Sequence, residues 1–125
     1  MGKIDDRLAQ LGIALPTPAA PVANYVGFVR TGNLVFTAGQ VTLADGKFHY
    51  TGKVGGEISL EDAQKAARLC AINVLAQLKL ACDGNLDRVK RIVKLVVFVN
   101  AVPTFTEHPK VANGASDVMV EVFGD

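Results

Sequence analysis

The residue types that most often carry chemistry are few and scattered in this sequence. The two histidines, His49 and His108, are far apart along the chain and have no cysteine or second histidine close by, so we expect no metal site. Cys70 and Cys82 fall in one predicted helix, where a rise of about 1.5 Å per residue places them roughly 18 Å apart. That separation is too long for a disulfide, and we expect two free thiols that serve as small core residues.

Two groups of residues suggest anion binding, and each has a simpler interpretation. The glycine-rich segment 52–56, GKVGG, precedes a predicted helix, but its spacing matches neither of the two common phosphate-binding motifs, and a plain turn is favoured. A basic cluster stands where a predicted strand begins, at Arg88, Lys90, Arg91 and Lys94. A solvated strand end is favoured there over contact with a phosphate backbone. No nucleophile elbow is present, and spacing identifies no Ser/His/Asp set.

Length and composition are those of one globular domain. The chain has 125 residues, 50% of them hydrophobic and 20% charged, which is enough to bury a core without disulfides or metals. Lysine and arginine total 13 against 12 acidic residues, so the net charge of +1 provides no basic field for nucleic acid. No apolar run approaches the roughly 20 residues of a membrane span, and residues 1–6 do not resemble a signal peptide. We expect a cytoplasmic protein, in keeping with its free cysteines.

The first half of the chain predicts a short helix, an arm and a β-hairpin. Ile4, Leu8 and Leu11 recur at helical spacing, and Gly12 follows where a C-terminal glycine belongs. The proline-rich segment 15–21 is expected to lie extended on the surface.

Two strands are predicted around the turn pair Gly32-Asn33, at Tyr25–Thr31 and Leu34–Ala38. Residues 41–56 are expected to be irregular, with room for a small extra hairpin at Asp45-Gly46.

The second half predicts two helices separated by a strand. Ser59 is a favourable N-cap for a long helix that ends near Asp83-Gly84. Pro109 suits the first turn of a last helix that ends near Gly124. Between them, Arg91–Asn100 has a continuous β-branched run, typical of a strand covered on both faces.

One cover for this strand is expected from the long helix, through Ala67, Cys70, Ala71 and Val74. The other must come from elsewhere in the domain or from another subunit. The order of elements predicts an α+β or α/β domain, with a sheet that looks one or two strands short.

An ordered set of segments resembles the YjgF/RidA family, also called L-PSP endoribonuclease-like. The set begins with a tyrosine, a hairpin turn, a few apolar residues and Gly-Gln, and continues with a long helix, a central strand and a last helix. In chain order the segments are Tyr25-Val26, Gly32–Gln40, Asp62–Val74, Leu86–Val99 and Phe105–Phe123. The last of these resembles a longer-chain subgroup, and the resemblance runs from about Leu11 to Asp125.

The resemblance implies a chorismate-mutase-like α+β fold, with a single sheet packed by helices on one face. It also implies a homotrimer with ligand clefts between subunits. The implied activity is hydrolysis of reactive enamine or imine intermediates, such as 2-aminoacrylate, to 2-keto acids and ammonia, without a cofactor. The partners would be a small molecule and other copies of the chain, with neither a membrane nor nucleic acid.

Four ligand-binding residues carry over from the family by position. Tyr25 matches the tyrosine that lines the cleft, with a cross-strand aromatic as the alternative. Gly39 matches the glycine whose backbone borders the ligand, with a strand-end bulge as the alternative. Ser116, or failing that Asn113, falls near a polar asparagine on the last helix, and either is otherwise a polar residue on a helix face. Ala38 stands where many members have serine, so a hydroxyl contact is lost.

The family's catalytic residues do not carry over. Its arginine follows the last helix in an Ala-Arg-Ser-like segment, before a closing strand that bears a glutamate, and residues 1–125 contain neither. We therefore expect a single domain without its C-terminal strand or strands. Three functions stay open: an enamine/imine deaminase, a trimeric small-molecule binder or regulator without turnover, and an endoribonuclease, which the near-zero net charge disfavours.

Overall fold

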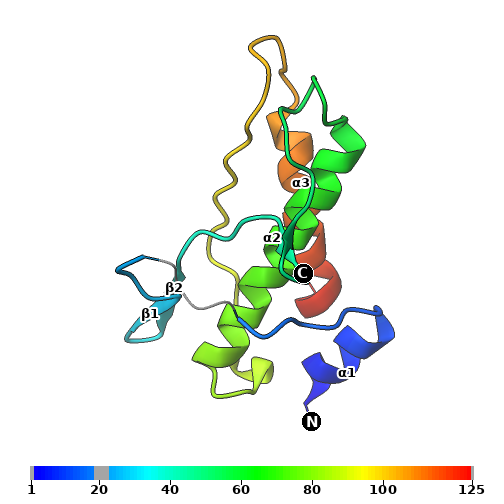
Figure 1. The fold of residues 1–125 in the computed structure, drawn as a ribbon. Helices are drawn as coiled ribbons and strands as arrows, with labels where there is room; N and C mark the ends of the chain where they lie inside the picture. Colours follow the sequence, from blue (N-terminus) through cyan, green and yellow to red (C-terminus); the bar gives the residue numbers. More distant parts are fainter. Residues whose placement is uncertain (1, 19–22, 125) are drawn as a thin grey trace.

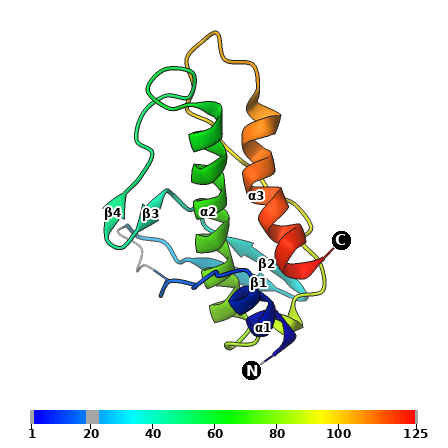
Figure 2. The ribbon, with the colours of Figure 1, turned by 90° about the vertical axis from the view of Figure 1, so that its right-hand side faces the viewer.

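The computed structural model describes residues 2–18 and 23–124. In chain order the elements are α1 (Lys3–Gln10), β1 (Phe28–Thr31), β2 (Leu34–Thr37), β3 (Leu43–Ala44), β4 (Lys47–Phe48), α2 (Leu60–Ala81), the short 3-10 helix η1 (Leu86–Arg88) and α3 (His108–Phe123). Helices α2 and α3 lie side by side and run in the same direction, while the chain between η1 and α3 runs back the opposite way (Figures 1 and 2). None of the helices in the described residues is long and apolar enough to cross a lipid bilayer.

The predicted start and end of the long helix are confirmed. The Ser59 hydroxyl accepts a hydrogen bond from the Asp62 N–H at 3.1 Å, so this side chain satisfies one of the free N–H groups at the start of α2. At the other end, Asp83 and Gly84 both adopt positive φ, which turns the chain away from the helix axis.

The predicted hairpin is also confirmed, with a shorter first strand. Strands β1 and β2 are antiparallel, with Val29 opposite Phe36 and Thr31 opposite Leu34. Gly32 has a φ of 56°, as a tight two-residue turn requires. The small extra hairpin at Asp45-Gly46 forms as well, because both turn residues take positive φ between β3 and β4.

The predicted strand at Arg91–Asn100 is not part of a sheet. The segment is extended, but the described residues form only two separate two-stranded sheets, β1–β2 and β3–β4. Backbone hydrogen bonds form only at the C-terminal end of the segment. There the Val54 N–H donates to the Asn100 carbonyl at 2.9 Å, and the Val102 N–H donates to the Val54 carbonyl at 3.0 Å. β-Branched residues favour extended backbone, yet a strand needs a hydrogen-bonded neighbour, and no described segment is hydrogen-bonded to residues 91–99. The predicted α+β class is confirmed. The prediction of one single sheet is wrong for the described residues, which form two small sheets.

Burial of this segment on both faces is also wrong within the single chain. Leu95, Val97 and Val99 pack against the core between the segment and the helices. The alternate side chains face away from the helices and are exposed, Val96 by 62% and Phe98 by 93%. Successive side chains of an extended chain point to opposite sides. Because the helices cover only one side of the segment, every second side chain is exposed.

The helical layer itself is tightly packed. Ala67 and Ala71 of α2 and Val111, Ala115 and Val118 of α3 are all buried in the core. The small side chains allow the two helix axes to approach closely. The helices approach closely at Gly114, where a Cβ would collide with the backbone carbonyl of Gln64.

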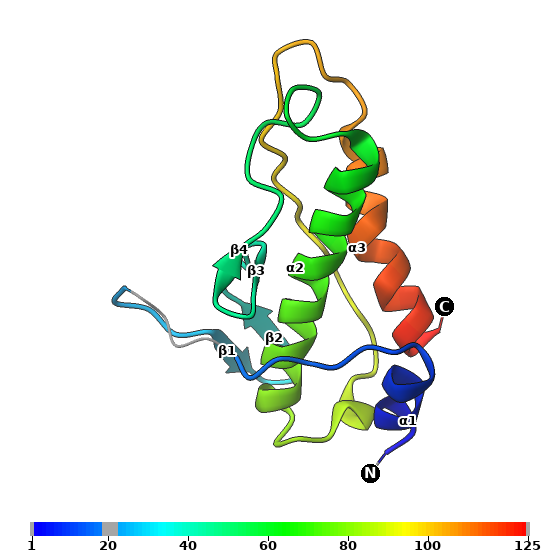
Figure 3. The same ribbon diagram turned by 45° about the vertical axis from the view of Figure 1, so that its right-hand side comes forward.

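The arm after α1 crosses the lower end of α2 (Figure 3). Leu11, Ile13 and Leu15 are half-buried and pack against the core, so this part of the predicted arm is anchored as well as extended. Residues 19–22 of the arm lie outside the described residues.

The contact at Gly114 generates the first prediction. A Gly114→Ala substitution should lower the free energy of unfolding by about 1–3 kcal/mol through overpacking, although alanine is the better helix former. Gly39→Ala is the matched control, because a Cβ there meets nothing within 4 Å; it should change stability by less than about 0.5 kcal/mol. Urea unfolding of both variants provides the comparison. A Gly114→Ala protein more stable than the parent would contradict the packing described.

Candidate functional site

Two of the predicted ligand-binding residues, Tyr25 and Gly39, lie together at the open end of the β1–β2 hairpin. The Ala38 N–H donates to the Gly27 carbonyl at 2.8 Å, which continues the ladder one pair beyond Phe28 and Thr37. Continuing this register places Tyr25 and Gly39 on adjacent chains within one residue of each other. The Tyr25 side chain is 52% exposed. We call these two residues the hairpin rim.

The space around Gly39 is open. A Cβ built there meets no atom within 4 Å, and its φ is not in the positive range. Neither packing within this chain nor backbone conformation therefore requires glycine at this position. The bare backbone leaves room for a ligand to approach the main chain, as the family resemblance implies.

A buried amide holds the rim in place. Gln77 of α2 is only 4% exposed, and its side chain lies against Gly27, where a Cβ would collide with the amide oxygen. Sequence reasoning missed this pair, because Gln77 is a polar residue within the buried face of the helix and was not counted in its apolar stripe. The glycine two residues after Tyr25 is the signal that could have indicated a close contact.

Ser116 lies elsewhere, in a cavity of about 330 Å³ between the extended segment and α3. The cavity is lined by Leu95, Val97, His108, Pro109, Ala112 and Ser116; we call it the groove. The His108 ring packs edge-on against Phe105, with ring centroids 5.2 Å apart. Asn113 is exposed on α3 and does not line the groove. The hairpin register thus puts Tyr25 and Gly39 on neighbouring chains, whereas Ser116 and Asn113 lie on α3.

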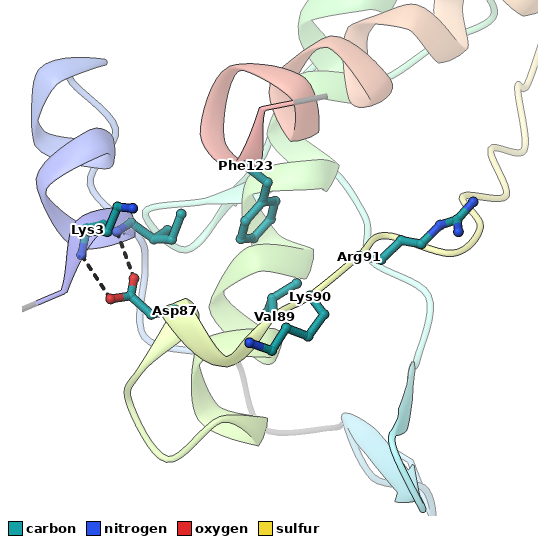
Figure 4. Close-up of a pocket in the computed structure, with 7 residues that line it drawn as sticks. Lys3, Asp87, Val89, Lys90, Arg91 and Phe123 are labelled. Atoms are coloured by element: carbon teal, nitrogen blue, oxygen red, sulfur yellow. Dashed lines mark hydrogen bonds between the residues drawn. The ribbon is translucent and has the colours of Figure 1, made fainter.

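A second cavity, of about 200 Å³, has basic residues but a structural role (Figure 4). It is lined by Lys3, Ile4, Asp87, Val89, Lys90, Arg91 and Phe123. The Asp87 carboxylate accepts from the Lys3 and Ile4 N–H groups at 3.0 and 2.9 Å, and so caps α1. These two bonds, to Ile4 and then Lys3, hold the pKa of Asp87 below its usual value. The Asp87 carboxylate is therefore engaged in a contact within the chain.

The other anion-binding candidates have partners too. In the glycine-rich turn the Glu57 carboxylate accepts from the Lys53 N–H at 2.8 Å, which lowers the pKa of Glu57, and Gly55 packs against Val102. This arrangement agrees with a plain turn. In the basic cluster, Arg88 pairs with Asp83 at 3.4 Å.

Three further arginines are also engaged in contacts within the chain. Arg30, which lies in β1, donates through Nε to the Gly32 carbonyl at 3.3 Å. Arg7 donates to the Glu121 carbonyl, and Arg68 pairs with the Glu121 carboxylate. Among the described contacts, no guanidinium is directed at Tyr25 or Gly39.

The thiols and histidines form no further site. Cys82 is buried, and burial of the half-exposed Cys70 raises the pKa of its thiol, so both fit the predicted role of core residues. His49 bonds through Nε2 to the Ala44 carbonyl at 3.2 Å. In residues 2–18 and 23–124, no three His, Cys, Asp or Glu side chains gather as a metal ion would need.

An antiparallel hairpin and an extended segment, covered on one side by two long parallel helices, make an α+β domain. A family model described as "YjgF/chorismate mutase-like, putative endoribonuclease" matches residues 5–125. The chain belongs to this family.

Individual relatives agree with this assignment. The chain is 47% identical over 124 residues to Protein TCP17 of Trypanosoma cruzi, covering 99% of this chain and 77% of that protein. Its fold is similar to that of Atu1372, a protein of unknown function from Agrobacterium tumefaciens, with a TM-score of 0.90, 44% identity and coverage of 98% of this chain and 74% of the other. A "putative endoribonuclease" from Shewanella oneidensis has a TM-score of 0.89, 35% identity and coverage of 98% and 81%.

The Asp87 cap generates the second prediction. An Asp87→Asn substitution should loosen α1 at pH 7, because a neutral amide is a weaker acceptor for the two N–H groups. The pKa of Asp87 is lower in the folded chain than in the unfolded one, so its stabilisation is present above about pH 4 and is lost as pH falls through the folded pKa.

Hydrogen exchange of the α1 amides at pH 7 and melting curves from pH 7 down to about 2 test this. The two proteins should differ most at neutral pH and converge in acid. Asp117→Asn, on the exposed side of α3, is the control. A constant difference across the whole pH range would show that charge on Asp87 is not what holds α1.

Proposed function

We propose that this chain carries the substrate-binding hairpin of a RidA-type hydrolase, an enzyme that converts small enamine and imine acids of the 2-aminoacrylate kind to 2-keto acids and ammonia. The observation that carries the proposal is the hairpin rim, where a half-exposed tyrosine lies beside a bare glycine backbone with free space above it. Family membership supports the same assignment.

Hydrolysis of an enamine or imine needs few groups from the protein. An enamine becomes an imine when a proton adds to its carbon; water then adds to the C=N carbon, and the C–N bond breaks to release ammonia. Each step involves a proton and a water and no redox change, so the protein has only to hold the substrate and position these. The Tyr25 hydroxyl both donates and accepts hydrogen bonds, and the main chain at Gly39 can contact a planar substrate closely.

RNA cleavage, which the family description names, is less well supported by this chain. The net charge of +1 provides little attraction for a polyanion. A ribonuclease also needs an acid and a base that share one site. Among the described contacts, neither histidine bonds to Tyr25 or Gly39: His49 bonds within the β3–β4 hairpin, and His108 packs on Phe105.

The rate of the 125-residue chain is the third prediction. No guanidinium is directed at the rim among the described contacts, and a missing charge-assisted hydrogen bond to the substrate carboxylate costs about 1.5–3 kcal/mol. This corresponds to about one to two orders of magnitude in rate. We expect hydrolysis near the uncatalysed rate for residues 1–125, and clear cofactor-free hydrolysis for any longer form that supplies an arginine to the rim.

The assay is release of 2-keto acid from 2-aminoacrylate generated in situ by a dehydratase. In an active form, Tyr25→Phe should lower kcat/KM, whereas Tyr50→Phe, in the loop after β4, should not. An active form whose kcat/KM is unchanged by Tyr25→Phe would contradict the proposal. Salt-sensitive RNA cleavage without imine hydrolysis would favour the ribonuclease instead.

We further propose that the protein is a homotrimer whose subunits meet through the outward face. This face consists of exposed apolar side chains that point away from α2 and α3: Val29, Leu34, Phe36, Val96 and Phe98. Exposed apolar residues gathered on extended chains favour contact with another protein surface. Further copies of the chain would cover the face symmetrically and bring surfaces of neighbouring subunits to each hairpin rim.

The fourth prediction follows from this face. Phe36→Lys should shift the protein from trimer to monomer in sedimentation equilibrium at micromolar concentration. Val120→Lys, which adds the same charge on the exposed side of α3, should leave the trimer intact. A parent protein that sediments as a monomer would refute the assembly.

A further inference from the structure

The side chain of Gln40 is a polar group at the hairpin rim to which no role has been assigned so far. Its Nε2 donates to the Ala38 carbonyl at 3.2 Å. The side chain must return past Gly39 to make this bond, so the Gln40 amide lies beside the bare backbone of the rim. The hairpin register, continued beyond β1 and β2, places Gln40 opposite Tyr25. Gln40 is half-buried, so part of it stays open to a ligand at the rim.

The bond to Ala38 determines which way the Gln40 amide faces. A carbonyl oxygen only accepts hydrogen bonds, so the amide nitrogen, and not the amide oxygen, must lie against it. The Ala38 N–H donates to the Gly27 carbonyl at 2.8 Å, but among the described contacts the Gly27 N–H does not donate back to Ala38. The Gln40 amide takes the place of this last ladder bond, and turning it over would leave the Ala38 carbonyl without a partner.

This orientation leaves the amide oxygen of Gln40 as an acceptor. Within residues 2–18 and 23–124, the hydrogen bond of the Gln40 side chain is the one made by its nitrogen, and no group donates to Oε1. An amide oxygen that is held in place favours a ligand that presents an N–H or O–H. It disfavours a ligand that presents an oxygen able only to accept.

The substrate and the product of the proposed reaction differ in this property. The nitrogen of an enamine or a protonated imine carries hydrogens that it can donate. In the 2-keto acid a carbonyl oxygen stands in place of that nitrogen, and it can only accept. We infer that Gln40 determines specificity at the rim: its Oε1 accepts a hydrogen bond from the substrate nitrogen and disfavours the keto acid. This inference rests on the proposed function, and it implies that loss of ammonia weakens binding and favours product release.

Two stable, planar carboxylates that differ in one ring atom test the inference. In pyrrole-2-carboxylate the carbon that bears the carboxylate carries an N–H, as in 2-aminoacrylate, whereas in furan-2-carboxylate it carries an oxygen. Each is titrated into the ¹⁵N-labelled chain, and the Gly39 amide signal is followed. The pyrrole should bind about fivefold more tightly than the furan, because only the pyrrole donates to Oε1. Equal affinities, or tighter binding of the furan, would overturn the role of Gln40 and leave the rim in place.

Two glutamine variants separate recognition from a structural role. Gln40→Met keeps a similar length without the amide, and the ratio of the two dissociation constants should fall to about one. Gln10→Met, in α1, is the control and should leave the ratio unchanged. If Gln40 only closed the end of the ladder, Gln40→Met would weaken both probes alike and preserve the ratio, which would overturn the inference.

The parent chain supplies a second measurement if Gln40→Met does not fold. The side-chain NH₂ signals of Gln40 should shift when pyrrole-2-carboxylate saturates the rim, and less when furan-2-carboxylate does. The same shifts with both probes would overturn the inference. No shift at Gly39 with either probe would refute the rim itself, and with it the role of Gln40.

Discussion

The close packing of α2 on α3 is the contact on which the rest of the structure depends. Gly114 lets the backbone of α3 approach the Gln64 carbonyl, and alanines line the seam on either side. Two parallel helices this close form a flat layer, against which the hairpin and the segment 91–99 both pack. From this layer Gln77 reaches Gly27 and holds the hairpin rim in place.

The same helical layer explains which surfaces of the domain are exposed. It covers one face of the hairpin and of the extended segment, so Phe36, Val96 and Phe98 are exposed on the other. It also leaves the groove between the segment and α3, whose lining includes His108 and Ser116. The apolar outward face favours association with whole subunits.

Sequence reasoning succeeded where short-range chemistry decides the structure. Ser59, the turn pair Gly32-Asn33 and Pro109 each determine a local conformation, and the elements begin or turn where they indicate. It failed for Arg91–Asn100, because β-branched residues specify extended backbone but not the neighbour that makes a strand. In the candidate site, the closeness of Tyr25 and Gly39 follows from the hairpin register and was predictable. The contacts of Asp87 with α1 and of Gln77 with Gly27 join residues 50 or more positions apart. No local sequence pattern predicts contacts over such separations.

The claim that Tyr25 and Gly39 form a ligand-binding rim is tested most directly by nuclear magnetic resonance. The ¹⁵N-labelled chain is titrated with 2-oxobutyrate, a 2-keto acid of the product class, and the amide shifts are followed residue by residue. Saturable shifts confined to the amides of Gly39, its neighbours and Tyr25 are the predicted result. Shifts confined to the groove around Ser116, or no shift at millimolar ligand, would contradict it.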